Sequence, residues 1–291
     1  IPQGVQDIDA TIKSESDPHL LNAEYSWEQA ANLRTQERVN RPKPYIFVGQ
    51  DIKPSVRSVL IDWIVEVCDQ FHMSSRALFQ VVELIDRSLS TLDIPRSKLQ
   101  LLGCACVILA AKFEEIYAPT AEELAHISDN TYTRAEIIKM ELEVARALSF
   151  RLSCVTPRCF FDRFCRAAGS NKREKSLVSY LLEILLLDYQ AVQLLPSLKA
   201  AAALYLARQT LCPSSNSSGR GKGSTWTTQT EFYTGYSAKD LEACVRRLHT
   251  LHLRSEGGNL KAVREKYTRA CHHRVADVTC IIPEALEFGE E

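Results

Sequence analysis

The feature that most constrains this chain is an apolar run, Leu101 to Ala111, that contains no charged residue. The run is rich in the helix formers Leu and Ala, so it predicts a helix that is apolar on every side. Such a helix is buried all round, yet this one is shorter than the roughly 20 apolar residues needed to cross a bilayer. We therefore expect the central helix of a helical domain, with small residues such as Gly103 and Ala110 letting neighbouring helices approach closely.

The apolar run ends in a charged and aromatic segment, KFEEIY (112–117), shortly before Pro119. Proline cannot continue a helix, so the chain must turn at this point. Charged and aromatic side chains at the end of an otherwise buried helix lie at the domain surface. We expect a functional surface there.

Composition and charge exclude several classes of protein. The chain has 291 residues, enough for one or two domains, and a net charge of −1, which favours neither nucleic acid nor an anionic membrane as a partner. Its ten cysteines form no Cys-x-x-Cys pair and stand mostly in apolar segments, as is typical of reduced thiols in the cytosol or nucleus. No apolar run reaches transmembrane length, and we expect no metal and no cofactor.

Apolar residues at helical spacing recur on both sides of the central helix, and no sustained strand alternation is present. Within SLKAAAALYLAR (197–208), residues 198–208 repeat the apolar, small-residue character of 102–112 without a gap, which indicates a second central helix. We predict an all-α fold of two tandem five-helix units, each around a buried central helix, preceded by an N-terminal helix. The predicted helices cover 17–38, 54–71, 78–89, 101–111, 120–127, 133–149, 157–164, 172–189, 197–208 and 238–253.

The domain boundaries follow from this arrangement. Residues 1–44 are an N-terminal extension with one helix, ending in the non-helical Arg41-Pro42-Lys43-Pro44. The first unit covers 45–152 and the second 153–256, with an inserted Ser- and Gly-rich loop at 212–225, and a tail follows at 257–291.

Nothing in the sequence points to catalysis. GRGKGST (219–225) lacks the spacing and the preceding strand of a phosphate-binding loop, and the pair His249 and His252 has no third metal ligand nearby. No nucleophile stands beside a general base in any recognisable pattern. We predict that the chain is not an enzyme.

Several segments carry a family resemblance. VRSVLIDWIVEV (56–67), KFEEIY (112–117) and ISDNTYTRAEIIKMELEVARALSF (127–150) resemble the first cyclin box of an A/B-type mitotic cyclin. The match continues in order through LLPS (194–197) and REKY (264–267). The resemblance implies two stacked cyclin-box folds and a non-catalytic protein that binds and activates a cyclin-dependent kinase.

The resemblance also implies which residues meet the kinase. Lys112 and Glu141 match the family's charged pair, which bonds to the partner. The neighbouring contacts are Phe113, Glu114, Glu115, Ile116 and Phe150. From spacing alone, Lys112 and Glu141 form a plain intramolecular salt bridge, and Phe113 and Ile116 are equally typical of core residues.

A second implied site is a groove that takes an Arg-x-Leu motif from substrates or inhibitors. Its matching positions are Val56, Val59, Leu60, Trp63, Glu66, Arg96, Leu99, Gln100 and Ile127. An apolar trough would hold the leucine, and Glu66 would attract the cation. Two valines stand where the family has longer side chains, which alters the groove walls. The alternative is that the apolar positions are simply the buried face of a helix.

Arg57 and Asp86 match a structural ion pair between the first two helices of the box, and we assign them to stability. The resemblance further implies a nuclear and cytoplasmic protein, with no nucleic-acid or membrane partner. The alternatives are a cyclin-fold scaffold or a transcription-type cyclin with little kinase activation. A transcription module would need a basic face, and the charge balance speaks against one.

Overall fold

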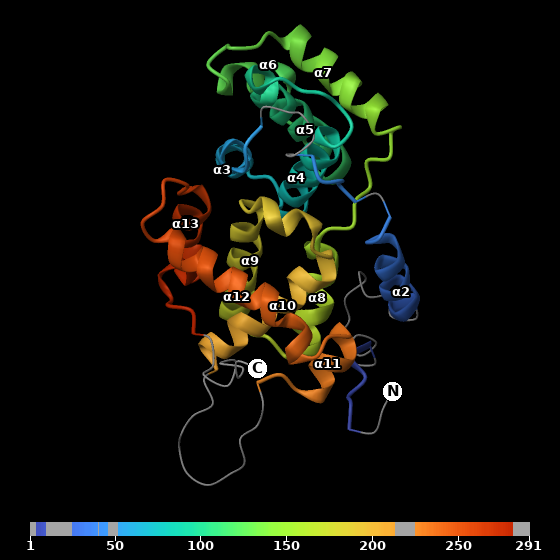
Figure 1. The fold of residues 1–291 in the computed structure, drawn as a ribbon, viewed down its shortest axis with the longest axis vertical. Helices are drawn as coiled ribbons and strands as arrows, with labels where there is room; N and C mark the ends of the chain where they lie inside the picture. Colours follow the sequence, from blue (N-terminus) through green and yellow to red (C-terminus); the bar gives the residue numbers. More distant parts are fainter. Residues whose placement is uncertain (1–3, 10–24, 40, 46–51, 213–224, 282–291) are drawn as a thin grey trace.

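The structure, a computed structural model, describes residues 4–9, 25–39, 41–45, 52–212 and 225–281. Within these ranges the regular elements are helices, and no strand occurs. The predicted all-α architecture is confirmed: two helical units stack along the long axis of the molecule (Figure 1).

The first unit, or first box, surrounds the predicted central helix. Its helices are α3 (Pro54–Gln70), α4 (Ser75–Leu89), α5 (Leu99–Glu114), α6 (Ala121–Ile127) and α7 (Arg134–Ala147). Every residue of α5 from Leu101 to Ala111 is buried, and α4 and α7 make its most extensive contacts. Capping boxes at Thr120 and Thr133 begin α6 and α7.

Gly103 explains how closely α3 approaches α5. A β-carbon at this position would lie 3.2 Å from Ile64 Cδ1 and 3.3 Å from both Leu60 Cδ1 and Trp63 Cζ3. A larger residue would therefore push the two helices apart. The small residues of the central helix serve the close packing expected from the sequence.

The second unit, or second box, repeats this plan around α10. Its helices are α8 (Pro157–Ala167), α9 (Lys172–Leu186), α10 (Pro196–Leu211), α11 (Thr228–Thr234) and α12 (Ala238–Ser255). The fourth helix of this unit, α11, had no counterpart among the helices predicted from the sequence. It is two turns long, starts at a capping box on Thr227 and ends at Gly235, whose φ of +66° is left-handed.

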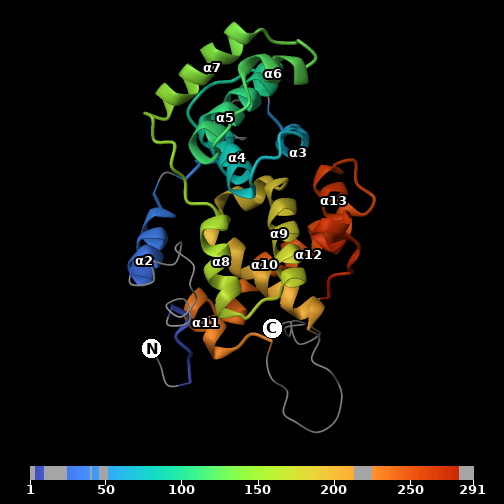
Figure 2. The ribbon, with the colours of Figure 1, turned by 180° about the vertical axis from the view of Figure 1, so that it is seen from behind.

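The N-terminal helix α2 (Ser26–Gln36) lies along the second box rather than the first (Figures 1 and 2). The predicted start of this helix near Asp17 lies outside the described residues. Arg34 of α2 donates to Ser197 Oγ at 2.6 Å and to Tyr236 Oη at 3.0 Å, and the buried Glu37 accepts from the Ser197 backbone N–H at 2.9 Å. These polar contacts attach a helix whose own apolar surface is small.

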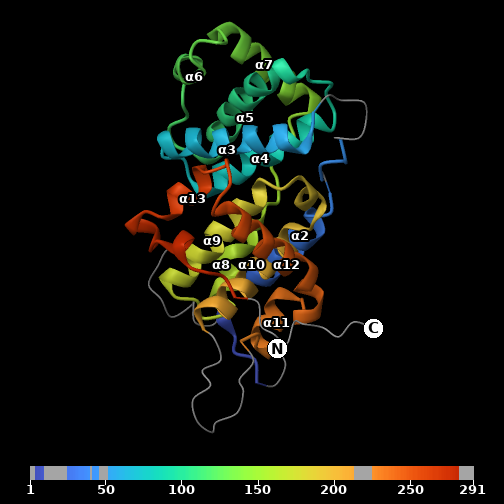
Figure 3. The ribbon, with the colours of Figure 1, turned by 60° about the vertical axis from the view of Figure 1, so that its left-hand side comes forward.

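The C-terminal segment returns to the first box. Helix α13 (Ala262–Tyr267) packs against both α3 and α9, and Figure 3 shows it between the two units. The Asp62 carboxylate of α3 accepts from the backbone N–H groups of Lys261 and Ala262, each at 3.2 Å. Residues beyond the second box therefore help to join it to the first.

Candidate functional site

The end of α5 projects the KFEEIY segment from the first box. Helix α5 stops at Glu114, and Glu115 Oε1 accepts from the Ser74 backbone N–H at 2.6 Å, which secures the turn. Beyond it, the Ile116 and Tyr117 side chains are 91% exposed. Large hydrophobic side chains so fully exposed are typical of a surface that meets a partner.

Lys112 and Glu141 are brought together across α5 and α7. Lys112 Nζ donates to Glu141 Oε1 at 2.6 Å, with the lysine side chain 57% exposed and the glutamate side chain 15% exposed. An ion pair this exposed contributes only ~0–1 kcal/mol to folding. The pair therefore fixes the position of two charged groups at the surface more than it stabilises the fold.

Three apolar residues stand close in the chain to the elements that carry this ion pair: two follow Lys112 at the end of α5, and one follows α7, which carries Glu141. Phe113, Ile116 and Phe150 are all more than half exposed, so the alternative that Phe113 and Ile116 are core residues is wrong. Phe150 follows α7 in a left-handed turn, with a φ of +55°, that is held by a hydrogen bond from its backbone N–H to the Ala145 carbonyl at 2.8 Å. Phe113 and Phe150 both line a cavity of about 570 Å³ between the two boxes and α2.

The candidate peptide groove lies along α3. Val59, Trp63 and Glu66 recur at helical spacing on one side of α3; Val59 and Glu66 are exposed and Trp63 is half-buried. Leu60 is buried against α5 near Gly103, so for this residue the helix-face alternative holds.

The other groove positions surround the start of α5. Leu99 is buried, Gln100 is half-buried, and both stand one turn before Gly103, beside the contact with α3. Arg96 is exposed in the short turn before α5, Val56 is half-buried at the start of α3, and Ile127 is half-buried at the end of α6.

The charge at one end of this surface is negative. Glu66 stands near Asp62 and Glu265, and its pKa is raised by partial burial and by these two acids. Three carboxylates gathered here suit a cationic ligand group more than an anionic one.

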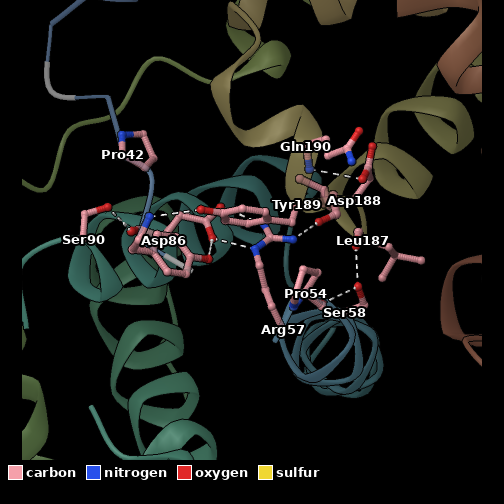
Figure 4. A network of polar contacts seen from close by, with 12 residues as sticks. Pro42, Pro54, Arg57, Ser58, Asp86, Ser90, Leu187, Asp188, Tyr189 and Gln190 are labelled. Carbon is pink, nitrogen blue, oxygen red and sulfur yellow. Dashed lines mark hydrogen bonds and ion pairs between the residues drawn. The ribbon is translucent and has the colours of Figure 1, made fainter. Parts of the chain in front are cut away.

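Arg57 and Asp86 form an ion pair that is buried, with side chains 2% and 4% exposed. Arg57 Nε and Nη2 both donate to the Asp86 carboxylate at 2.7 Å (Figure 4). Burial alone lowers the pKa of Arg57, but the Asp86 charge and its hydrogen bonds outweigh burial and raise it. The guanidinium therefore stays charged inside the protein.

The same pair also joins the two boxes, which the sequence did not reveal. Arg57 Nη1 donates to the Leu186 carbonyl at 2.7 Å, and Ser58 Oγ donates to the Leu187 carbonyl at 2.7 Å. Tyr45 from the linker donates its hydroxyl to Asp86 Oδ1 at 2.7 Å. Backbone carbonyl acceptors carry no side-chain signature, so no sequence pattern identifies them.

The structure offers no sign of other chemistry in the regions it describes. No helix there is long and apolar enough to cross a membrane, and no group of three or more His, Cys, Asp or Glu side chains is arranged to hold a metal. The cysteines are free thiols.

Comparisons with known proteins agree on one family. The cyclin N-terminal domain matches residues 28–153 and the cyclin C-terminal domain matches residues 155–281. A viral cyclin from Herpesvirus saimiri shares the fold, with a TM-score of 0.64 and 21% identity over 76% of this chain and 95% of that chain.

Plant A-type cyclins are similar over nearly the whole chain. Cyclin-A1-4 of Oryza sativa is 39% identical over 94% of this chain, and the chain covers 75% of that relative. Cyclin-A2-3 of Arabidopsis thaliana is 40% identical over 96% of this chain, but the chain covers 61% of its length. Cyclin-A1-1 of Oryza sativa is 37% identical over 99% of this chain, and the chain covers 56% of the length of that relative. The chain thus belongs to the cyclin family of non-catalytic kinase regulators, and it is a homologue of the A-type, mitotic cyclins.

Proposed function

We propose that this chain is the regulatory subunit of a cyclin-dependent Ser/Thr kinase in cell-cycle control, and that it binds and activates that kinase through the end of α5. The observation that carries the proposal is the Lys112–Glu141 ion pair at the surface, together with the exposed residues Phe113, Ile116 and Phe150 at or just beyond the ends of α5 and α7. Burial of apolar side chains supplies binding energy, and an ion pair held in a fixed position orients the partner by hydrogen bonding to its backbone groups.

The mechanism is an interface-driven switch in the kinase. An inactive kinase lacks the ion pair between its catalytic lysine and a helix glutamate, because that helix is displaced. A rigid surface that contacts the helix favours the position in which the ion pair forms. The end of α5 suits this task because α4 and α7 hold the helix on both sides.

We propose that the surface along α3 recruits substrates or inhibitors that carry an Arg-x-Leu motif. Trp63 and Val59 provide apolar contact for the leucine, while Glu66 with its acidic neighbours attracts the arginine. Recruitment on a surface separate from the kinase interface raises the local concentration of substrate. We expect the complex to act in the nucleus and the cytoplasm.

Binding tests the kinase interface directly. We expect Lys112→Ala with Glu141→Ala to weaken binding to a monomeric cyclin-dependent kinase by at least tenfold, equivalent to about 1.4 kcal/mol, in calorimetric titration. The matched control is Arg134→Ala with Glu122→Ala, which removes another exposed ion pair of the first box, with Arg134 Nε 2.6 Å from Glu122 Oε1. Equal affinities for the two double variants would refute the interface.

The phosphorylation rates of substrates with and without the Arg-x-Leu motif test the proposed groove. We expect Val59→Asp, at an exposed position on α3, to slow phosphorylation of Arg-x-Leu substrates without changing that of short peptides lacking the motif. Leu253→Asp, at an exposed position of α12, is the matched control. An equal effect of Val59→Asp on both substrate types, or no effect on either, would show that recruitment does not use this surface.

A further inference from the structure

A second cavity opens on the first box, away from the α3 surface. Its volume is about 400 Å³, and it lies between the linker at 41–43, the C-terminal end of α4 and the turn that follows α7. Ser90, directly after α4, donates from its Oγ to the Lys43 carbonyl at 3.0 Å, which holds the linker in place beside the cavity. Arg41 and Arg151 also line the cavity of about 570 Å³ beside Phe113 and Phe150, so this cavity adjoins the proposed kinase interface, but none of the residues assigned to that interface or to the groove lines it.

Four cationic side chains line the cavity: Arg41, Lys43, Arg87 and Arg151. No Asp or Glu is among the described residues of its wall, although hydroxyl groups such as that of Ser149 are. Like charges repel, so four cations around one cavity raise the energy of the folded chain unless an anion joins them. The cavity is therefore built to favour a negatively charged ligand.

Among these residues, Arg87 gives the strongest evidence for an anion-binding site. It is only 7% exposed, and within the described parts of the chain it forms no ion pair. Its Nη1 donates to Cys154 Sγ at 3.0 Å, a weak acceptor. Glu83, one turn earlier on α4, lines other cavities and makes no ion pair with Arg87; burial raises its pKa, and the nearby charges of Arg87 and Arg41 only partly offset this. A buried guanidinium without an ion-pair partner is costly, and a bound anion would compensate for it.

The chemistry of the wall matches a phosphate monoester better than a carboxylate. A phosphate on a side chain carries nearly two negative charges and three strong acceptor oxygens, and Arg presents several donors in a fixed plane. The Arg41 Nη2 already donates to the Gln193 carbonyl, while Lys43 and Arg151 make no side-chain hydrogen bond among the described residues. Two cations at the rim are thus available to a ligand.

The surroundings of the cavity favour a phosphate group carried by a protein over the phosphates of a nucleic acid. The cations gather in one cavity and the chain as a whole has a net charge of −1, whereas a nucleic-acid backbone is typically bound by an extended basic face. We propose that this cavity binds the phosphate of a phosphorylated serine or threonine in a partner protein.

The test uses the whole chain without a kinase, so it does not depend on the kinase interface. The probe is N-acetyl-O-phosphoserine N-methylamide, and the readout is the shift of arginine side-chain N–H resonances during titration at about 150 mM salt, where the screening length is about 8 Å. We expect saturable shifts with this probe, none with the unphosphorylated amide, and weaker binding of inorganic phosphate.

Two double variants locate the site. Lys43→Ser with Arg151→Ser removes two rim cations and should weaken binding of the probe roughly tenfold, which corresponds to about 1.4 kcal/mol. Lys53→Ser with Arg146→Ser makes the same change in charge at exposed positions outside the cavity and should leave binding unchanged. Circular dichroism confirms that each variant is folded.

Three results would overturn the proposal. The first is the absence of saturable binding of the phosphoserine probe to the unmodified chain. The second is an equal loss of binding in the two double variants, which would mean that only the net charge matters. The third is tighter binding of inorganic phosphate or of a short single-stranded DNA than of the probe, which would exclude a protein-borne phosphate as the preferred ligand.

Discussion

The buried pair of Arg57 and Asp86 allows the sharpest test of how the two boxes are held together. We consider the substitutions Arg57→Met and Asp86→Leu, alone and combined. Arg57→Met removes both N–H donors to Asp86 and the donor to the Leu186 carbonyl; it leaves a carboxylate, 4% exposed, with the Tyr45 hydroxyl as its remaining side-chain partner. Asp86→Leu leaves a guanidinium, 2% exposed, without a counter-charge.

The magnitude follows from what each variant leaves behind. Removing one partner of a buried ion pair typically costs ~3–5 kcal/mol, because an uncompensated charge stays buried. The double variant removes both charges and leaves two neutral groups, the Tyr45 hydroxyl and the Leu186 carbonyl, short of a partner. Replacing a whole buried pair by apolar residues is often close to neutral, so the double variant should cost less than either single variant.

Urea unfolding followed by far-ultraviolet circular dichroism measures these differences in the free energy of unfolding. We expect a coupling energy of at least ~2 kcal/mol from the double-mutant cycle, within the range for residues in direct contact. The same cycle on the exposed pair of Arg134 and Glu122 should give ~0–1 kcal/mol. Additive costs at Arg57 and Asp86 would refute the reasoning.

Three further predictions concern other contacts in the fold. Gly103→Leu should separate α3 from α5 and destabilise the chain by ~1–3 kcal/mol in urea unfolding, and an unchanged midpoint would show that the close approach is unnecessary. Burial raises the pKa of Glu83 to about 7, so the folded state keeps a proton that the unfolded state loses near its ordinary value. Stability should therefore fall as the pH rises from about 4.5 to about 7, by ~1–3 kcal/mol, and Glu83→Gln should remove most of this fall; identical pH profiles would contradict this. Asp62→Ala removes the acceptor for two N–H groups at the start of α13, so limited proteolysis beyond Lys261 should accelerate, and unchanged cleavage would mean that other contacts hold α13.

The central helices could be predicted from the sequence because their apolar character is unbroken. Leu101–Ala111 and, in the repeat, 200–207 carry no charged residue and leave no solvated face, so burial and helix packing follow directly. Helix α11 was not predicted because its seven residues present no repeating apolar face; its ends depend on the cap at Thr227 and the left-handed Gly235.

The candidate site was only partly predictable. The sequence placed Lys112 beside Glu141, but the exposure of Phe113 and Ile116 depends on where the chain turns after α5. Arg57 was expected to stabilise the first box, whereas its hydrogen bond to the Leu186 carbonyl also reaches the second. Contacts to backbone carbonyls depend on the tertiary arrangement, and side-chain patterns do not encode them.

The activation of a kinase by the purified chain is the most direct test of the proposed function. The chain is mixed with a monomeric, inactive cyclin-dependent kinase, and phosphate transfer to a Ser-Pro peptide is followed as the concentration of the chain increases. We predict a saturable rise of several orders of magnitude, as expected when a kinase active site is completed, and loss of that rise in Lys112→Ala with Glu141→Ala. Binding without a rise in phosphate transfer, or no binding to any of several related kinases, would contradict the account.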